Sequence, residues 1–599
     1  MGKNLMKVFA LILTAMLVIS LAACGSGEAK TGDKTASEAL DKQEQSTVPE
    51  ATEKPKEPVT LTFMAGGAGQ YAGGIQTDSV AKEIEKKLGI SMDCDFAVTQ
   101  EKYNAMLASG DLPDIIHVDI ESGSTGYTYI EQLIKGNHLL DMDQYLESNG
   151  QDILKETPEK IKFSRQFYSL GQNKLYFLTG NDYGMKPNNV KSFIAEASGI
   201  GMWVRWDYYK ELGYPEVKDD ILDLIPILKQ MQEKHPTTED GKKVYAVAPW
   251  LADWNLWNFT VFHQGYINRF AEKEGFVDLD WKTHEVFTQI GDTNSSLWQG
   301  VKFYNKCKQA GILDPDSVTM KFSTYLEKVQ AGRVLFSPVG WAANGFDKAA
   351  AQAGHPEQGF MPVKLPNKIN TYTSGYYSPV NGRFLWAITK SCENPDRAMD
   401  FINYIMSYEG TRLLWNGVEG EQWSVVNGVP LRTAEASKAY KEDPNWSDKT
   451  GVQKYYNMLG RNGSVIDPKY NCPINYSYNQ DLSVQTKESP IYTDYTQHYN
   501  VSYPGELFEK QLTGNIKSDN THFAMVESTP AEIKQINDKL MNYLTSSMVK
   551  LVLAKDDAAF EAGQKKIIED CKNMGYEQAF QWHKKAYDDA KAKYDAMMK

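Results

Sequence analysis

The chain has 599 residues, of which 42% are hydrophobic and 24% are charged, so it is long enough for about two to four compact units with hydrophobic cores. Its 77 acidic residues exceed its 64 basic residues and give a formal net charge of -13, which disfavours nucleic acid as a partner because nucleic-acid-binding proteins displace counterions with positive charge. Tyr (34 residues) is more frequent than Phe (23 residues), and 13 Trp are present, which favours a binding surface whose aromatic rings carry a polar edge.

The N-terminal residues are typical of an exported lipoprotein. Two lysines precede the apolar run 8–19, which is too short to span a bilayer but has the length of a signal-peptide core. Leu21-Ala22-Ala23-Cys24-Gly25 then resembles the bacterial lipobox, in which Cys24 becomes the lipidated first residue; the alternative is an ordinary cleavage site with an incidental cysteine. We therefore expect a signal peptide at 1–23 and a protein anchored to the membrane through its lipid, at the extracellular face of the cell membrane.

A lipidated flexible tether is expected at 24–58. From Gly25 to Pro58 the sequence contains no aromatic residue and consists mostly of Lys, Glu, Asp, Ser, Thr, Gly and Ala. Such a segment cannot bury enough apolar surface to become ordered. It would carry the folded part clear of the lipid surface.

The remaining cysteines are widely spaced and odd in number. No CxxC pair or metal-binding spacing is present, so we expect buried free thiols without a disulfide framework. These residues are Cys94, Cys307, Cys392, Cys472 and Cys571.

The folded part begins with alternating strands and helices. Strands are expected at 59–64, 90–96 and 115–118, a glycine loop at 65–74, and helices at 80–88, ending at Gly89, and around 103–109. This order predicts an open, largely parallel α/β sheet, whose ligand would bind at the carboxyl ends of the strands.

The glycine loop also matches a dinucleotide-binding fingerprint. Gly67-Ala-Gly69-Gln-Tyr-Ala72 has the GxGxxA pattern after a strand, and Asp93 or Asp95 lies near the position of a ribose-binding acid. An exported lipoprotein has no evident supply of a nicotinamide cofactor, and the glycines continue to Gly74. We therefore favour a loop that needs conformational freedom, and we expect no cofactor.

Several motifs in chain order resemble extracellular solute-binding protein family 1, the capture components of ABC importers. They are Leu107-Ala-Ser-Gly-Asp-Leu-Pro-Asp-Ile-Ile116, Gly201-Met-Trp-Val-Arg-Trp206, Ala331-Gly-Arg-Val-Leu-Phe336 and Asn394-Pro-Asp-Arg-Ala-Met399, followed by Gly417-Val-Glu-Gly420. The resemblance covers roughly residues 59–425. Each motif alone is weakly specific, and their order carries the resemblance.

The resemblance implies an α/β, two-lobe periplasmic-binding-protein-like fold of type II, with a ligand cleft between lobes that crossing strands join. It implies a first lobe at 59–180 plus 375–425 and a second lobe at 181–374 plus 426–599, the latter ending in a helical C-terminal extension. The lobes would close over the ligand. We expect a monomer that passes its ligand to ABC permease subunits in the membrane.

Two helices have a structural pattern. Asn394 and Pro395 suit the N-cap and first position of a helix whose apolar residues repeat on one face. Those residues are Ala398, Phe401, Ile402, Ile405 and Met406. A second helix ends at Lys234, and it has to begin near Asp223 so that Pro226 falls in its first turn.

Some longer members of the family carry a calcium loop of alternating Asp and Asn after this second helix. Here residues 235–243 read His-Pro-Thr-Thr-Glu-Asp-Gly-Lys-Lys, which lacks the ordered oxygen ligands and adds two cations. We therefore expect no metal site in this protein.

Tryptophans that follow strands are the main candidates for ligand contact. A sugar ring presents an apolar face that stacks on an indole, and hydroxyl groups that need polar partners. The candidate ligand-binding residues are Gln70, Tyr71 and Asp119 in the first lobe and Trp203, Arg205, Trp254 and Trp341 in the second. The alternative is core packing for each Trp and a solvated turn for Asp119, and Trp386 is expected in the core.

The common catalytic motifs GxSxG, HExxH and GxxxxGK[ST] are absent from the sequence. Glycosidase carboxylates need only meet in space, so a lipid-anchored glycoside hydrolase or lyase is the second hypothesis, and a peptide receptor or surface adhesin is the third. The sequence favours a receptor without catalytic activity that captures an oligosaccharide for an ABC importer.

Overall fold

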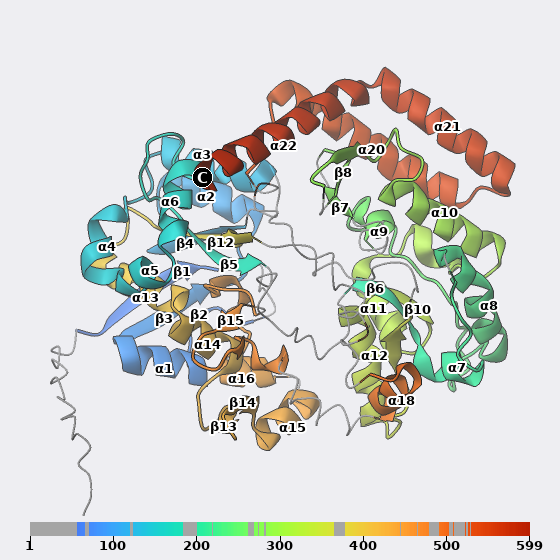
Figure 1. Ribbon diagram of the computed structural model, residues 1–599, viewed down its shortest axis with the longest axis horizontal. Helices are drawn as coiled ribbons and strands as arrows, with labels where there is room; N and C mark the ends of the chain where they lie inside the picture. The colour runs from blue at the N-terminus through green and yellow to red at the C-terminus, as the bar shows by residue number, and fades with distance from the viewer. Residues whose placement is uncertain are drawn as a thin grey trace, which may run out of the picture. The chain divides into compact units, whose positions relative to one another are not determined.

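Two α/β sheets, each with its own hydrophobic packing, organise the compact unit from Lys56 to Lys599 (Figure 1). The computed structural model describes residues 57–65, 71–119, 124–183, 200–218, 220–261, 269–272, 275–280, 283–364, 378–443, 445–463, 465–478, 490–501, 507, 522, 525–527 and 529–598. The expected signal peptide, the lipidated Cys24, nearly all of the tether and Gln70 lie outside these described residues.

The first sheet has six strands in the order β2-β3-β1-β4-β12-β5. Strands β1, β3 and β4 are parallel, whereas β12 is antiparallel to both β4 and β5. The strands are β1 (Val59–Met64), β2 (Gly74–Ile75), β3 (Ile90–Asp95), β4 (Ile115–Asp119), β5 (Leu178–Tyr183) and β12 (Ser378–Ile388). The predicted parallel start of the sheet is therefore confirmed.

Helix α1 (Ser79–Leu88) connects the first two long strands. Its N-cap, Asp78, accepts a hydrogen bond from the N–H of Ala81 at 2.9 Å. The helix ends at the predicted Gly89, whose φ of 66° is the left-handed conformation that favours glycine. The other helices before β5 are α2 (Gln100–Ser109), α3 (Ser124–Lys135), α4 (Asp143–Asn149), α5 (Gln151–Glu156) and α6 (Pro158–Phe167).

Alternate residues of β4 and β12 face two hydrophobic clusters, because side chains point to opposite faces along a strand. Ile115 and Trp386 belong to one cluster, and Ile116 and Leu385 belong to the other. Trp386 is fully buried, which confirms its predicted place in the core.

Helix α13 (Pro395–Met406) packs in the same cluster as Trp386. All five residues of its predicted apolar face are buried: Ala398, Phe401, Ile402, Ile405 and Met406. Asn394 stands at the N-cap and Pro395 is the first helical residue, as predicted, although the Asn394 side chain makes no capping hydrogen bond. Its φ of -125° and ψ of 63° differ from the extended backbone that a capping side chain requires.

A late segment of the chain joins this cluster. Tyr455, Leu459 and Ile474 are buried beside α13, and the ammonium of Lys160 donates to the carbonyl of Gly460 at 2.9 Å. The division taken from the resemblance assigned these late residues to the second lobe, whereas they pack with the first sheet. The neighbouring elements are α14 (Tyr408–Asn416), β13 (Trp423–Val426), β14 (Val429–Arg432), α15 (Ala434–Glu442), α16 (Trp446–Thr450), β15 (Ile466–Asp467) and β16 (Cys472–Pro473).

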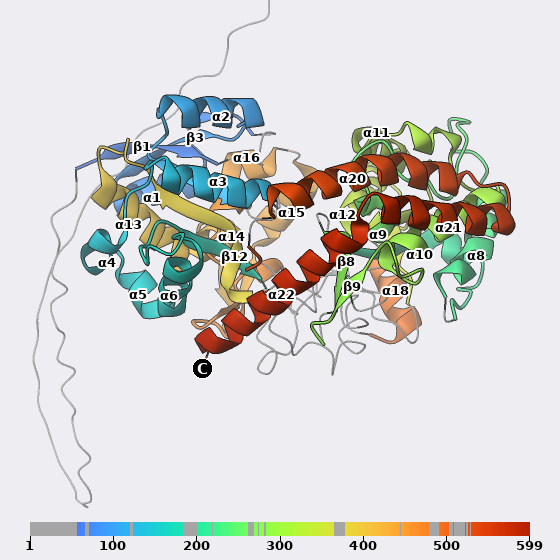
Figure 2. The same ribbon diagram turned by 90° about the horizontal axis from the view of Figure 1, so that it is seen from above.

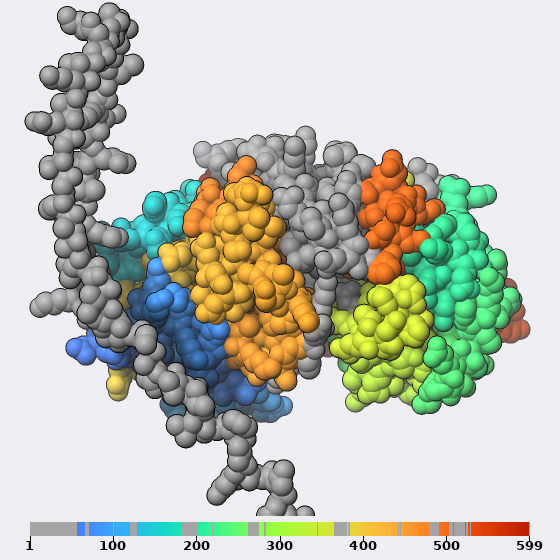
Figure 3. Space-filling model, turned by 90° about the horizontal axis from the view of Figure 1, so that it is seen from below, coloured from blue at the N-terminus to red at the C-terminus, as the bar shows by residue number. Residues whose placement is uncertain are grey.

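The second sheet has three antiparallel strands in the order β10-β6-β11, namely β10 (Phe336–Val339), β6 (Ile200–Arg205) and β11 (Phe360–Pro362). It shares one core with α7 (Trp206–Glu211), α8 (Leu224–Lys234), α9 (Trp257–Thr260), α10 (Ser296–Gln309), α11 (Phe322–Gln330) and α12 (Gly340–Gln352). Helix α8 begins after Asp223 and holds Pro226 in its first turn, as predicted. Helix α18 (Pro490–Tyr499) lies at the surface near α12 (Figure 3).

Three long helices end the described chain: α20 (Ala531–Val552), α21 (Asp557–Asn573) and α22 (Tyr576–Met598), all red in Figure 2. Tyr576 at the start of α22 belongs to the second core, whereas Ala590 and Tyr594 near its end belong to a cluster on the first sheet. Helix α22 therefore packs against both. A small sheet of β7 (Arg269–Glu272), β8 (Val277–Asp280) and β9 (Val286–Thr288) lies beside it.

The five cysteines within the described residues are all buried and free, as predicted. Among the helices that the structure describes, none combines the length and the apolar character that a membrane span requires.

Candidate functional site

Three tryptophans beside the second core form a partly exposed group. Trp254 and Trp341 keep 41% and 45% of their surface exposed. The ring of Trp257 lies 5.3 Å from that of Trp254 and 6.3 Å from that of Trp341, measured between centroids. We call Trp254, Trp257 and Trp341 the tryptophan group. Trp257 was not among the residues predicted to bind ligand.

Trp254 rests on two aromatic side chains, the partly buried Phe322 and the fully buried Trp250. Its ring stacks on Phe322 at 4.1 Å and 30°, and its edge meets the fully buried Trp250 at 5.6 Å. Trp254 and Asn255 have φ angles of 58° and 48°, in the left-handed region that non-glycine residues rarely adopt. The exposed indole therefore stands on a tight turn that its surroundings hold in place.

Helix α12 follows β10 directly, and Trp341 is its second residue. Helix α12 can begin so close to the sheet because Gly340 carries no Cβ; an added Cβ would lie 2.5 Å from the ring of Trp203. Trp203 itself is 4% exposed and belongs to the core, so the structure places it beneath the site rather than on its surface.

Arg205 is also buried, with 2% of its side chain exposed. Its guanidinium donates two hydrogen bonds to Asp207, Nε to Oδ1 at 2.9 Å and Nη2 to Oδ2 at 2.6 Å. The rings of Tyr208 and Phe346 enclose it, each with its centroid 4.1 Å from Cζ. Arg205 therefore joins β6, α7 and α12, and it is not on the exposed surface.

A second carboxylate lies close to this ion pair. Asp347 of α12 accepts a hydrogen bond from the N–H of Phe360 in β11 at 2.9 Å. Burial raises the pKa of Asp347 to about 7, opposed by the Phe360 N–H and by the charge of Arg205 and assisted by the charge of Asp207. Helix α12, which carries Trp341, is thus fixed to the sheet by a carboxyl group with a shifted pKa.

In the first sheet, the predicted residues lie near the carboxyl ends of parallel strands. Asp119 is the last residue of β4 and pairs with Phe384 of β12. Tyr71 is partly buried, with its ring 6.2 Å from that of Phe96, just after β3. This edge is where ligands bind in open α/β sheets.

The late segment also contributes to this edge. The ammonium of Lys454 lies 5.9 Å from the centroid of Tyr71, and the amide of Asn457 donates to the carbonyl of Ala65, just after β1, at 3.4 Å. Sequence reasoning missed both residues, because nothing in their local pattern says which sheet they join. For Trp257, the signal was its place in the same tryptophan-rich segment as Trp250 and Trp254.

Within the described residues, no group of three His, Cys, Asp or Glu side chains is placed to hold a metal ion. At 235–243, where a calcium loop was considered, the chain forms a turn. Thr237 and Lys243 form a β-bridge, and the N–H of Thr238 donates to the carbonyl of Lys242 at 2.8 Å. The hydroxyl of Thr238 donates to Asp240.

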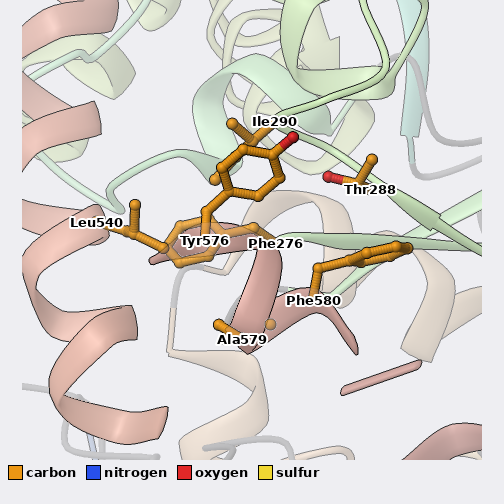
Figure 4. A pocket seen from close by; sticks show the side chains of 8 residues that line it. Phe276, Thr288, Ile290, Leu540, Tyr576, Ala579 and Phe580 are labelled. Atoms are coloured by element: carbon orange, nitrogen blue, oxygen red, sulfur yellow. The ribbon is translucent and has the colours of Figure 1, made fainter. Parts of the chain in front are cut away.

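A crevice with an empty volume of about 170 Å³ lies between the small sheet and the C-terminal helices (Figure 4). Phe276, Ile290, Leu540 and Phe580 line it, with Tyr576 and Thr288 supplying hydroxyl groups. The crevice leaves no room even for a water molecule, so it is not the main ligand site.

Comparison with known proteins gives the fold and the family. A curated relative, the fructooligosaccharide ABC transporter substrate-binding protein FusA of Streptococcus pneumoniae serotype 4, is 24% identical over 331 residues. The match covers 53% of this chain and 54% of FusA, so the chain matches about half the length of that relative.

Solved structures match over more of the chain. FusA of S. pneumoniae in complex with kestose has a TM-score of 0.58 at 15% identity, covering 89% of this chain and all of that one. The alginate-binding protein AlgQ2 without calcium ion has a TM-score of 0.53 at 17% identity, covering 89% and 98%. These likenesses confirm the predicted two-lobe α/β fold.

The family model for bacterial extracellular solute-binding proteins matches residues 95–412. That span is more than half of the chain, and it runs from the end of β3 into α14. It includes both exposed tryptophans of the tryptophan group. The chain therefore belongs to the bacterial extracellular solute-binding protein family.

Proposed function

We propose that this protein is an extracellular receptor that captures an oligosaccharide and delivers it to the permease subunits of an ABC importer. The observation that carries the proposal is the tryptophan group, whose Trp254 and Trp341 are the most exposed tryptophans within the described residues. Indole faces in contact with water are suited to the apolar face of a sugar ring. The rings of Phe322 and Trp250 beneath Trp254 hold its face in place before ligand arrives.

The relatives support the same substrate class. FusA is described as a substrate-binding protein for fructooligosaccharides, and one of its structures contains kestose. AlgQ2 is described as alginate-binding. We carry this class to the present chain as part of the proposal, together with capture by closure of the two lobes.

A neutral oligosaccharide fits the site better than an acidic one. An acidic sugar would require a cation at the site, and Arg205 is the arginine among the candidate ligand-binding residues. Its guanidinium is already paired with Asp207 and enclosed by two aromatic rings. Tyr71, Asp119, Trp254 and Trp341 remain the proposed ligand contacts, and Gln70 is retained from the sequence.

The proposal includes a lipid anchor at Cys24, a place at the extracellular face of the cell membrane, a monomeric state and the absence of catalysis. The support for the anchor is the order of lysines, apolar run and Leu21-Ala22-Ala23-Cys24. Mass spectrometry of the processed protein tests it. The mature N-terminus should be an acylated Cys24, and Cys24→Ala should be released or left unprocessed; an unacylated terminus elsewhere would contradict the anchor.

A thermal-shift panel tests the receptor proposal. Purified mature protein is heated with kestose, nystose, a neutral glucan trisaccharide and an alginate trisaccharide, and calorimetry then measures Kd for each sugar that stabilises it. A ligand at about 100 times its Kd adds about 2.7 kcal/mol to the free energy of unfolding. We expect at least one neutral sugar to stabilise the protein by about this amount and to be recovered uncleaved. Turnover would favour a hydrolase, and no stabilisation by any sugar would contradict the proposal.

A further inference from the structure

Both oxygens of the Asp253 carboxylate accept hydrogen bonds from backbone N–H groups of the site. Oδ1 accepts a hydrogen bond from the N–H of Trp254 at 3.1 Å, and Oδ2 accepts one from the N–H of Phe322 at 3.3 Å. The side chains of these two donor residues stack on each other at 4.1 Å. One carboxylate thus fixes the backbone beneath both rings of a stacked pair.

The hydrogen bond from the N–H of Phe322 to Asp253 also caps the start of helix α11. Phe322 is the first residue of α11, and the residue at its N-cap, Lys321, makes no capping hydrogen bond with its side chain. The first N–H groups of a helix have no partner within the helix, and a negative charge there is favourable. Asp253 supplies both the acceptor and the charge from a distant loop.

A second polar side chain closes the turn that carries Trp254. Asn258 is 1% exposed, and its Nδ2 donates to the carbonyl of Asp253 at 2.5 Å and to that of Asn255 at 3.3 Å. The turn contains two consecutive non-glycine residues in the left-handed region, Trp254 and Asn255. Such a backbone persists only where surrounding contacts hold it.

We infer that Asp253 is a positioning residue, which sets the orientation of the Trp254 indole for the sugar. The inference rests on the proposed function, because it assumes that Trp254 contacts the ligand. Without the carboxylate, the N–H groups of Trp254 and Phe322 lose their acceptor, so the turn relaxes and the indole leaves its place on the Phe322 ring. Ligand binding then has to reorder the turn, which weakens affinity.

A double-mutant cycle separates positioning from direct contact. Calorimetry with kestose, or with the neutral sugar that stabilises the wild type most, gives Kd for Asp253→Ala, Trp254→Ala and the double variant. If Asp253 acts through Trp254, each single change raises Kd about tenfold and the double variant also raises it about tenfold. If Kd of the double variant is raised about a hundredfold, Asp253 and Trp254 contribute independently to binding, and the inference would be overturned.

A second readout needs no ligand. Trp254 lies 5.6 Å from Trp250 and 5.3 Å from Trp257, at interplanar angles of 85° and 70°, so these indoles couple and give an exciton band in circular dichroism. The band is isolated as the difference between wild type and Trp254→Phe. Asp253→Ala should lose it, and Asp253→Asn should keep part of it, because an amide oxygen can still accept one of the two bonds.

The matched control is Asp443→Ala. Asp443 also accepts a nearby backbone N–H, from Asn445 at 2.9 Å, and it lies outside the tryptophan group. The control should keep both the exciton band and the wild-type Kd. An unchanged band in Asp253→Ala would overturn the inference whatever the ligand. If no sugar binds the wild type, the proposed function fails, and the band alone decides the role of Asp253. Should Asp253→Ala not fold, Asp253→Asn replaces it in both measurements.

Discussion

The carboxylate of Asp78 caps helix α1 and also binds Lys454, which lies 376 residues later in the chain. Oδ1 accepts the N–H of Ala81, and Oδ2 accepts the Lys454 ammonium at 3.1 Å and the hydroxyl of Tyr455. The side chains of Asp78 and Lys454 are 1% and 5% exposed. A buried ion pair thus fixes the late segment to the start of the first sheet.

Breaking this pair should destabilise the protein strongly. Lys454→Met leaves the Asp78 carboxylate buried without its cation, which lowers the free energy of unfolding by about 3–5 kcal/mol. Urea denaturation followed by fluorescence measures the change. Asp78→Asn combined with Lys454→Met should recover part of the loss, because no uncompensated charge remains.

The control for this prediction is Lys584→Met on α22, where the exposed pair of Lys584 and Asp588 has an N–O distance of 2.9 Å. An exposed pair of this kind contributes about 0–1 kcal/mol. If Lys454→Met and Lys584→Met denature at the same urea concentration, the buried pair does not stabilise the late segment.

Local patterns in the sequence predicted local structure well. The end of α1 at Gly89, the buried face of α13 and the start of α8 before Pro226 were all predicted, because each depends on residues within a few turns. Trp254 and Trp341 are exposed, and their role as ligand contacts stays a prediction.

Long-range packing could not be predicted in the same way. Trp203 and Arg205 lie in a strand whose burial depends on what covers it, and here Gly340 and Phe346 cover them. The position of Lys454 against Asp78 depends on a partner several hundred residues away. Hydrophobic spacing shows that a residue is buried, but it does not show against which sheet.

The carboxyl group of Asp347 should make stability fall as pH rises. Burial raises its pKa to about 7 in the folded protein, whereas an aspartate of the unfolded chain titrates near 3.9. Between these pH values the folded protein holds a proton that the unfolded chain releases. The contribution of Asp347 to the free energy of unfolding is therefore complete at low pH and is lost as pH rises through about 7. Asp347→Asn removes this titration and keeps an acceptor for the N–H of Phe360.

The melting temperatures of wild type and Asp347→Asn, compared from pH 5 to pH 8 by calorimetry, check this expectation. The melting temperature of the variant should rise relative to that of the wild type as the pH increases. Asp443→Asn, at a partly exposed carboxylate with a lowered pKa, should show no such gain across this range. A constant difference between wild type and Asp347→Asn would mean that Asp347 does not titrate in this window.

His583 should make the stability of the folded protein fall as the pH decreases into the acid range. It is buried in α22, where its Nε2 accepts a hydrogen bond from Asn537 at 2.9 Å, and burial lowers its pKa to about 4. A histidine of the unfolded chain titrates near 6.5. Its contribution is complete above that value and is lost as pH falls toward 4, because the unfolded chain then binds a proton that the folded protein does not.

Hydrogen exchange and melting of His583→Gln test this expectation. Glutamine does not titrate, so the acid-induced loss of stability between pH 6.5 and pH 4.5 should be smaller in the variant than in the wild type. Exchange in α22 of the wild type should increase first, because His583 and Asn537 join α22 to α20. An identical acid profile in both proteins would contradict the role of His583.

Trp341 separates binding from folding most directly. Its side chain is 45% exposed at the start of α12, so truncation removes little packing, whereas the indole face that a sugar would cover is lost. Trp341→Ala should raise Kd at least about tenfold, equivalent to about 1.4 kcal/mol, with only a small change in the melting temperature of the ligand-free protein.

Trp250→Ala provides the contrast, because Trp250 is fully buried beneath Trp254. Its truncation should lower the free energy of unfolding by about 3–5 kcal/mol through the cavity that it leaves. Tyr440→Ala, at an aromatic side chain that is 36% exposed outside the tryptophan group, should change neither quantity much. If Trp341→Ala melts at a much lower temperature while its folded fraction binds sugar normally, Trp341 supports the core rather than the ligand. The tryptophan group would then not be the binding surface.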